Sequence, residues 1–178
     1  MSRIFGPIDQ ICWVVPDIDA SMKYWADALG IGPWFCARNL APTDFEHMGA
    51  ASQPEISLAI AYSGRMQLEL VQQHNDAPSM YRDSELAGNV PGQHHLGFFR
   101  RDYDERLGEA LAQGYEVGHQ GRIGDIRFAY LKTEKEPGMI AELIELSDPV
   151  EAAYVALHGI AGEWDGSEPI RSMAMTAE

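Results

Sequence analysis

The chain repeats one pattern of elements along its 178 residues. In each half an apolar segment typical of a strand precedes a helix that ends at a glycine, Gly30 or Gly114, and further strands follow. Gln10 in the first such segment matches His95 in the second. A repeat at this length scale indicates two similar modules that share one fold.

The first half predicts the order strand, helix, strand, strand, strand. Residues 8–15 are rich in β-branched and aromatic types and end at Pro16, which favours a strand. Apolar residues at three- and four-residue spacing predict a helix that ends at Leu29, with Asp19 or Ser21 as its N-cap. Three more strands follow, the last two joined by a hairpin at Gly64: residues 34–37, 55–62 and 66–71.

The second half repeats this order after a segment rich in proline and glycine. Its expected elements are strands at 95–99, 116–118, 126–132 and 139–146 and a helix at 103–113. We therefore expect an α+β domain over 1–148, divided into module one (6–72), a linker (73–91) and module two (92–148), with a C-terminal helix and tail over 149–178. Trp164 is the expected anchor of that tail.

The strand that begins near Gly92 carries two adjacent histidines. If side chains alternate there, His95, Gly97 and Phe99 share one face and His94 points to the other. The glycine leaves space beside His95. A single strand histidine is more often a core residue, but the repeat favours a site here.

Each half has one donor in its first strand and one carboxylate in its last. The donors are Gln10 and His95, and the carboxylates are Glu69 and Glu145, obtained by matching Leu-Glu-Leu with Ile-Glu-Leu. A buried unpaired carboxylate is costly, so two in matched strands predict a metal site. Three oxygens and one nitrogen suit Mn, Mg, Co, Ni or Zn. Cys12 is either a softer ligand or a small core residue.

Composition narrows the classes of partner. The formal net charge of −14 and the scattered basic residues argue against nucleic acid. No apolar run approaches the ~20 residues that span a bilayer. Cys12 and Cys36 do not make a disulfide framework, so we expect a cytoplasmic protein without nucleic-acid or membrane partners.

On these residues the chain resembles the vicinal oxygen chelate superfamily, which includes glyoxalase I, methylmalonyl-CoA epimerase, extradiol dioxygenases and bleomycin-resistance proteins. The resemblance covers residues 6–148 and implies two βαβββ modules, related by a pseudo-twofold, whose strands form a half-open curled sheet around a metal. Ile8-Asp9-Gln10 with Val15-Pro16-Asp17 is most similar to the epimerase-like branch, which has histidine at the place of Gln10. The Gln/Glu/His/Glu set is similar to zinc-type glyoxalase I instead, and extradiol dioxygenases use two histidines and a glutamate.

The resemblance implies a metal-dependent lyase or isomerase that transfers a proton next to a carbonyl, of glyoxalase I-like or epimerase-like type. The implied cofactor is Zn, Ni, Co or Mn, and the implied catalytic pair is Glu145 as base with Glu69 as its partner. The substrate class is a small carbonyl compound or thioester, and a homodimer is expected. A metal-free binding protein of bleomycin-resistance type and an extradiol-type dioxygenase remain as alternatives. The C-terminal segment either covers the cleft or extends a dimer contact.

Overall fold

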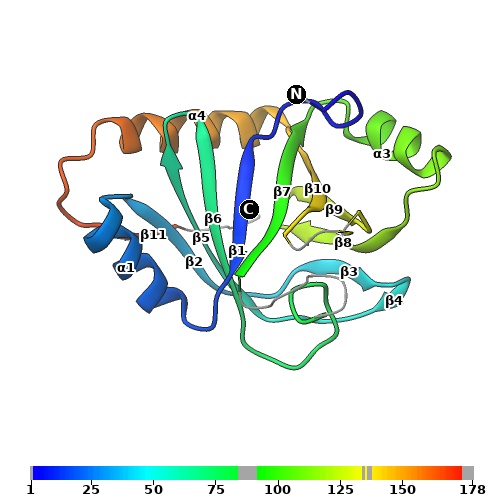
Figure 1. Ribbon diagram of the computed structural model, residues 1–178, viewed down its shortest axis with the longest axis horizontal. Coiled ribbons are helices and arrows are strands. Elements are labelled where there is room, and N and C mark those ends of the chain that lie inside the picture. The colour runs from blue at the N-terminus through cyan, green and yellow to red at the C-terminus, as the bar shows by residue number, and fades with distance from the viewer. Residues whose placement is uncertain (1, 84–91, 134, 136–137, 174–178) are drawn as a thin grey trace.

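The computed structural model describes residues 2–83, 92–133, 135 and 138–173, and within them one mixed sheet of eleven strands carries three helices (Figure 1). The predicted α+β class is confirmed. The strands are β1 (Gln10–Val14), β2 (Trp34–Leu40), β3 (Thr43–His47), β4 (Ala50–Ala51), β5 (Ile56–Ser63), β6 (Met66–Gln73), β7 (Gly92–Arg100), β8 (Val117–Ile123), β9 (Ile126–Leu131), β10 (Ile140–Glu145) and β11 (Ile170–Ser172). The helices are α1 (Ile18–Leu29), α3 (Tyr103–Ala112) and α4 (Asp148–Gly162).

The sheet is arranged around its two central strands, β1 and β7, which run antiparallel to each other. Outward from β1 come β6, β5 and β2, and outward from β7 come β10, β9 and β8. β1 is parallel to β6, as β7 is to β10. The two strands that carry Gln10 and His95 are therefore neighbours, and the order of strands on one side mirrors that on the other.

Two short segments close the ends of the sheet, and neither was expected as a strand. β3, which begins at Thr43, and β4 cross to the second half, where β3 pairs with β8. β11 pairs with β2 at the opposite end. The first half of the chain thus supplies the outermost strands, β3 and β4, on the side of the sheet formed by the second half.

The N-cap of helix α1 lies two residues before the earlier of its two expected positions. Asp17 is the N-cap, and its side chain accepts a hydrogen bond of 2.9 Å from the backbone N–H of Ala20. Pro16, directly before it, favours the extended backbone that an N-cap needs. The helix ends as predicted at Gly30, whose φ of 65° lies in the left-handed region.

The hydrophobic core lies on both faces of the sheet. Seven consecutive residues of β5, from Ile56 to Tyr62, are buried, so both faces of that strand are covered. On one face α1 packs through Met22 and Trp25 against Leu70. Full burial of a side chain such as Leu70 contributes roughly 1.5–3 kcal/mol.

The expected linker (73–91) contributes to the core in its described part. Met80 and Tyr81 are buried, within a turn in which the N–H groups of Arg82 and Asp83 bond the carbonyl of Ser79. Residues 84–91 lie outside the described residues, as do Glu136 and Pro137 of the expected turn before β10.

Helix α4 and the segment after it complete the fold. Trp164 packs on Gly32, where an added Cβ would lie 2.9 Å from the indole ring, and its Nε1–H donates to the carbonyl of Ser167 at 2.6 Å. The C-terminal helix predicted at this position is present, and Trp164 does anchor the segment after it. Among the described residues, no helix is long and apolar enough to cross a bilayer.

Candidate metal centre and its cavity

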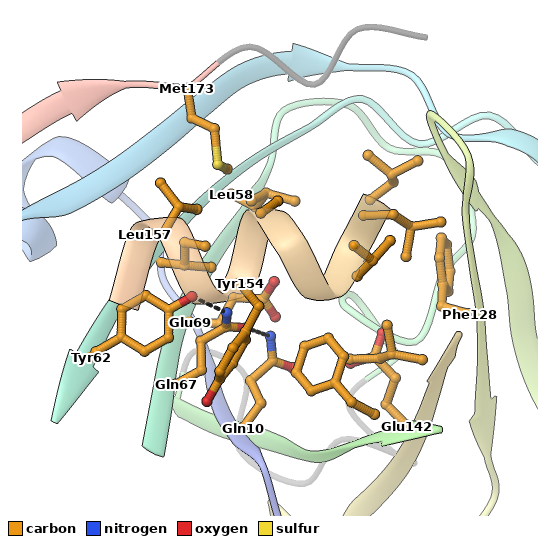
Figure 2. Close-up of a pocket in the computed structure, with 17 residues that line it drawn as sticks. Gln10, Leu58, Tyr62, Gln67, Glu69, Phe128, Glu142, Tyr154, Leu157 and Met173 are labelled. Carbon is orange, nitrogen blue, oxygen red and sulfur yellow. Dashed lines mark hydrogen bonds between the residues drawn. The ribbon is translucent and has the colours of Figure 1, made fainter. Parts of the chain in front are cut away.

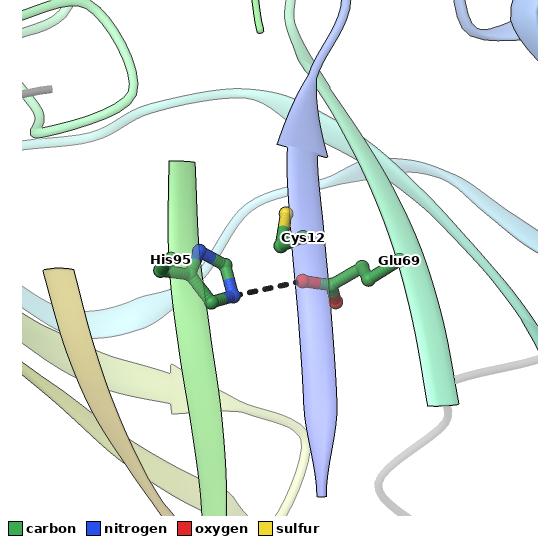
Figure 3. Close-up of side chains that lie close together, drawn as sticks. All are labelled: Cys12, Glu69 and His95. Atoms are coloured by element: carbon green, nitrogen blue, oxygen red, sulfur yellow. Dashed lines mark ion pairs between the residues drawn. The ribbon is translucent and has the colours of Figure 1, made fainter. Parts of the chain in front are cut away.

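Three side-chain oxygens surround one nitrogen of His95. Its Nε2 lies 3.0 Å from Oε2 of Glu142, 3.3 Å from Oε2 of Glu69 and 3.3 Å from Oε1 of Gln10. All four residues are buried, and His95 has no exposed surface. Figure 3 shows Glu69 and His95 facing each other across β1, beside Cys12. The structure therefore brings together three of the four residues expected from the sequence.

The four central strands of the sheet supply one donor each. Gln10 of β1 and Glu142 of β10 both stand opposite Gly97 of β7 in the strand register. A Cβ at Gly97 would lie 2.5 Å from Oε1 and 2.9 Å from Cβ of Gln10. The space that was expected beside His95 because of Gly97 is thus filled by the Gln10 side chain.

Glu145 does not join the cluster, and its predicted convergence with the other three residues is wrong. It lies at the end of β10 and forms a two-pronged ion pair with Arg127, with both N–O distances at 2.8 Å. Glu142 and Glu145 are three residues apart, so they point to opposite faces of a strand. Ala141-Glu142-Leu143 carries the same apolar-Glu-apolar signal and is the true counterpart of the β6 segment around Glu69.

A chain of amides orients the oxygen of Gln10 towards the cluster. Nε2 of Gln10 donates to Oε1 of Gln67 at 2.8 Å, and Nε2 of Gln67 donates to the hydroxyl of Tyr62 at 3.0 Å (Figure 2). Because its nitrogen is engaged, Gln10 turns its carbonyl oxygen towards His95.

His94 fixes the tautomer of its neighbour. Its Nε2 lies 2.9 Å from the carbonyl of Met80, which only accepts, so that nitrogen carries a proton. Nδ1 of neutral His94 is then an acceptor for Nδ1–H of His95, at 3.0 Å. Nε2 of neutral His95 is left with a lone pair directed at the three oxygens. In metal centres, a hydrogen bond to the other ring nitrogen of a ligating histidine commonly fixes its tautomer and ring orientation in this way.

A β-bulge makes this contact between adjacent residues. Cys12 stands opposite His95 while Trp13 stands opposite Gln93, which leaves His94 as the extra residue of β7. A bulge redirects a side chain that strict alternation would place on the other face. The sequence expectation for His94 fails for this reason.

Burial and charge act in opposite directions on the two histidines. Burial lowers the pKa of His95, but the charges of Glu142 and Glu69 outweigh it and raise the pKa to about 9. Burial and the neighbouring His95 lower the pKa of His94 to about 3. Burial raises the pKa of Glu142 against the attraction of His95.

Cys12 is within reach of the cluster but is a poor candidate ligand. Its Sγ and the ligand atoms of Glu69 and His95 all lie within 4.8 Å of one another. Burial, followed by the charge of Glu69, raises the pKa of the thiol well above its ordinary value. Metals bind the thiolate, so the thiol behaves as a core residue.

The four donors fit a divalent cation. Ligands at ~2.1 Å from one metal stand roughly 3.0 Å apart on an octahedron and roughly 3.4 Å apart on a tetrahedron. The three distances from Nε2, 3.0, 3.3 and 3.3 Å, span that interval. Oε2 of Glu142, although buried beside His95, has no aligned hydrogen-bond partner among the described residues. A lone pair facing three oxygens needs a positive charge between them, either a proton or a metal ion.

A cavity of about 140 Å³ opens on the three residues that supply the oxygens, Gln10, Glu69 and Glu142 (Figure 2). Its polar floor is made by Gln10, Gln67, Glu69 and Glu142. The walls are apolar and come from β5, β7, β8, β9, β10, α4 and the last described residue: Leu58, Ile60, Tyr62, Phe99, Ile123, Ile126, Phe128, Ile144, Val150, Ala153, Tyr154, Leu157 and Met173.

Fold and site together define a class: a protein with a curled mixed sheet around a cavity, with buried carboxylate, amide and imidazole groups at its floor. A sequence profile of the Glyoxalase/Bleomycin resistance protein/Dioxygenase superfamily matches residues 9–130. The chain belongs to this superfamily, as its resemblance to the vicinal oxygen chelate proteins implied. A search of curated protein sequences found no match.

Solved structures share the fold at low sequence identity. A hypothetical protein, BH1468 from Bacillus halodurans C-125, is 16% identical with a TM-score of 0.56, over 80% of this chain and 95% of its own. A methylmalonyl-CoA epimerase from Mycobacterium tuberculosis is 17% identical with a TM-score of 0.55, over 85% and 95%. A further methylmalonyl-CoA epimerase is 16% identical with a TM-score of 0.54, over 83% and 100%. At these identities the likeness concerns the fold.

Proposed function

We propose that this protein is a divalent-metal-dependent lyase or isomerase that transfers a proton at a carbon next to a carbonyl. The observation that carries the proposal is the placement of three oxygens within 3.3 Å of Nε2 of His95, at the floor of a cavity. Gln10, Glu69, His95 and Glu142 are the proposed ligands. Zn, Ni, Co and Mn are the proposed metals, because oxygen and imidazole donors suit them.

A bound divalent cation would supply Lewis-acid stabilisation of the negative charge that develops on the substrate oxygen. The chain itself supplies the base. Glu142 is the proposed base, because its Oε2 has no aligned hydrogen bond among the described residues and the carboxylate lines the cavity. Burial raises its pKa, which strengthens the carboxylate as a proton acceptor. It takes the role that the sequence had assigned to Glu145.

Glu69 is the proposed partner of Glu142 across the site. It also lines the cavity, from the opposite side of the central strand pair. A carboxylate on each side lets one accept the proton while the other returns it to the substrate. The apolar walls exclude water from the transfer. Glyoxalase I-like and epimerase-like reactions share this step, and both fall within the proposal, for a small carbonyl or thioester substrate.

The test has two parts. First, purified protein without an affinity tag is stripped with a chelator and titrated with Co²⁺, whose visible spectrum reports coordination. One ion per chain is expected, and loss of binding in His95→Ala is the matched outcome. Failure of the wild-type protein to bind Co²⁺, Zn²⁺, Ni²⁺ or Mn²⁺ overturns the metal centre.

Second, proton exchange is followed by NMR in deuterated solvent with two α-hydroxyketones, 3-hydroxybutan-2-one and 2-hydroxycyclohexanone, and with methylmalonyl-CoA. Glu142→Gln keeps the side-chain volume and an oxygen donor, so it should retain Co²⁺ and lose exchange by ~10²–10⁴-fold. Glu145→Gln is the matched control, since Glu145 pairs with Arg127 and does not line the cavity. Parental exchange in Glu142→Gln with metal bound would remove Glu142 as the base.

A metal-free binding protein is the second candidate, because the cavity is mostly apolar and a proton on His95 satisfies the same oxygens. The Co²⁺ titration distinguishes the two candidates. The metal-dependent enzyme binds the ion, whereas the metal-free binding protein takes up its ligand without any metal. An extradiol-type dioxygenase is less favoured, since within the described part of the chain only one histidine nitrogen faces the centre, and His94 is engaged with Met80.

A further inference from the structure

The roof of the cavity comes from a part of the chain that lies beyond the superfamily match. The match ends at residue 130, while Val150, Ala153, Tyr154, Leu157 and Met173 all line the cavity. Figure 2 shows α4 running across the cavity, with Leu157 and Tyr154 directed into it. The size and chemistry of what binds there are therefore set in part by α4.

Helix α4 is held over the cavity by contacts with the β5–β6 hairpin. The hydroxyl of Tyr154 donates to the carbonyl of Arg65 at 2.9 Å, and Nε2 of His158 lies 2.9 Å from the carbonyl of Gly64. The ring of Tyr62 packs edge-on against both Tyr154 and His158, at 5.4 Å. These contacts fix α4 against the hairpin.

The volume of the cavity is small. A cavity of about 140 Å³ is close to the 150 Å³ of an engineered apolar cavity in another protein that binds benzene. The space accommodates roughly one six-membered ring, so a nucleotide or a tripeptide would have to lie outside it. A larger group placed at the donors would need to displace α4 from the hairpin.

The charges of the residues that line the cavity also favour a small, uncharged ligand. Of the described residues, no Lys, Arg or His lines the cavity, and its charged groups are Glu69 and Glu142. A divalent cation on these two carboxylates leaves a centre of zero net charge. A phosphate or a free carboxylate on the ligand would find no cationic partner within the cavity walls.

We propose that the substrate is a compact, uncharged carbonyl compound of about the size of one six-membered ring, with two neighbouring oxygens, and that α4 excludes coenzyme A thioesters and glutathione adducts. This inference rests on the proposed function for the position of the oxygens. The apolar body of such a ligand would lie under Leu157 and Met173, with its oxygens at the polar floor.

The test measures binding directly, through the methyl group of Met173, which lines the cavity. The protein is labelled with ¹³C-methyl methionine and loaded with Zn²⁺, and the Met173 resonance is assigned with Met173→Leu. Added 2-hydroxycyclohexanone should shift this resonance at saturable concentrations. Methylmalonyl-CoA and the hemithioacetal of methylglyoxal with glutathione should leave it in place. If either of them shifts it at lower concentration than 2-hydroxycyclohexanone, the size class is wrong.

Two variants examine the role of α4. Leu157→Trp fills the cavity and should weaken binding of 2-hydroxycyclohexanone by ~10-fold or more; Ala153→Phe serves the same purpose if Leu157→Trp does not fold. Ile160→Trp is the matched control, because Ile160 is 42% exposed on the same helix and lines none of the cavity. Unchanged binding in a folded cavity-filling variant contradicts the proposal.

Failure of this inference is distinguishable from failure of the proposed function. Binding of 2-hydroxycyclohexanone without α-proton exchange leaves the ligand class standing and removes the proposed chemistry. Proton exchange on methylmalonyl-CoA, together with a shift of the Met173 resonance when it is added, leaves the proposed chemistry standing and removes the ligand class.

Discussion

Nδ1 of His94 lies 3.0 Å from Nδ1 of His95, and this contact gives two adjacent histidines opposite roles. His94 is held neutral, with a pKa of about 3, because it is buried beside the positive charge of His95. His95 is drawn towards a positive charge by two carboxylates, with a pKa of about 9. One ring acts as an acceptor so that the other directs a single nitrogen at the centre.

The first prediction concerns this pair. His94→Phe keeps an aromatic ring but removes the acceptor for Nδ1–H of His95, so His95 is free to adopt the other tautomer. Loss of such an outer partner typically lowers metal affinity by ~10–100-fold. Titration with Co²⁺ measures the change. His74→Phe is the control, since His74 is exposed and bonds Ser57 away from the centre. Equal affinities in both variants would mean that His94 has no positioning role.

The second prediction concerns the stability of the metal-free protein on the alkaline side. The folded pKa of His95, about 9, is above its ordinary value of 6.5, so its contribution is complete below pH 6.5 and is lost as pH rises to about 9. The loss is on the order of 3 kcal/mol. Urea unfolding in the presence of a chelator should show this decline, and His95→Gln should lack it. A level wild-type profile from pH 6.5 to 9 would show that His95 is not charged in the folded state.

The contribution of His94 to stability changes with pH in the opposite direction, and it does so at acid pH. Its folded pKa, about 3, is below the ordinary 6.5, so its contribution is present above pH 6.5 and is lost as pH falls towards 3. The acid decline should therefore be shallower in His94→Phe than in the wild-type protein. The difference between the two urea profiles isolates this residue from the carboxylates that titrate in the same range.

The last prediction concerns the close packing of Gly97 against the side chain of Gln10. In Gly97→Ala the new methyl group would lie 2.5 Å from Oε1 and 2.9 Å from Cβ of Gln10, and the Cβ cannot move without the strand. Overpacking of this kind costs about 1–3 kcal/mol. Weaker Co²⁺ binding should accompany it, as the amide is displaced. Gly108→Ala in α3 meets nothing within 4 Å and should be neutral or stabilising. Unfolding free energies and Co²⁺ titrations of both variants check the pair.

Much of the fold follows from local signals in the sequence. The repeat is visible because both halves begin with a strand, continue with a helix that ends at a glycine, and finish with an apolar-Glu-apolar strand. Gln10, Glu69 and His95 lie near these landmarks, and all three meet in the structure. The C-terminal helix was predictable from its periodicity alone.

The failures have specific physical causes. Strand β10 holds two apolar-Glu-apolar motifs, and the choice between Glu142 and Glu145 depends on register against β7, which local sequence does not encode. His94 is redirected by a bulge. Strand β8 is longer than predicted because glycines interrupt its pattern, and Gly118 is needed where Met80 packs: an added Cβ would lie 2.2 Å from its sulfur. β3 pairs with a strand some seventy residues away, a contact that no local pattern predicts.

The terminal strands of the sheet have a consequence for how copies of this chain meet. The sheet begins with β11, of three residues, and ends with β4, of two. A long strand at a sheet margin exposes a row of unpaired N–H and C=O groups on which another chain can polymerise, and very short marginal strands remove that template. Both margins are therefore poor seeds for fibrous aggregation, and self-association of folded copies is directed to side-chain surfaces and away from backbone pairing.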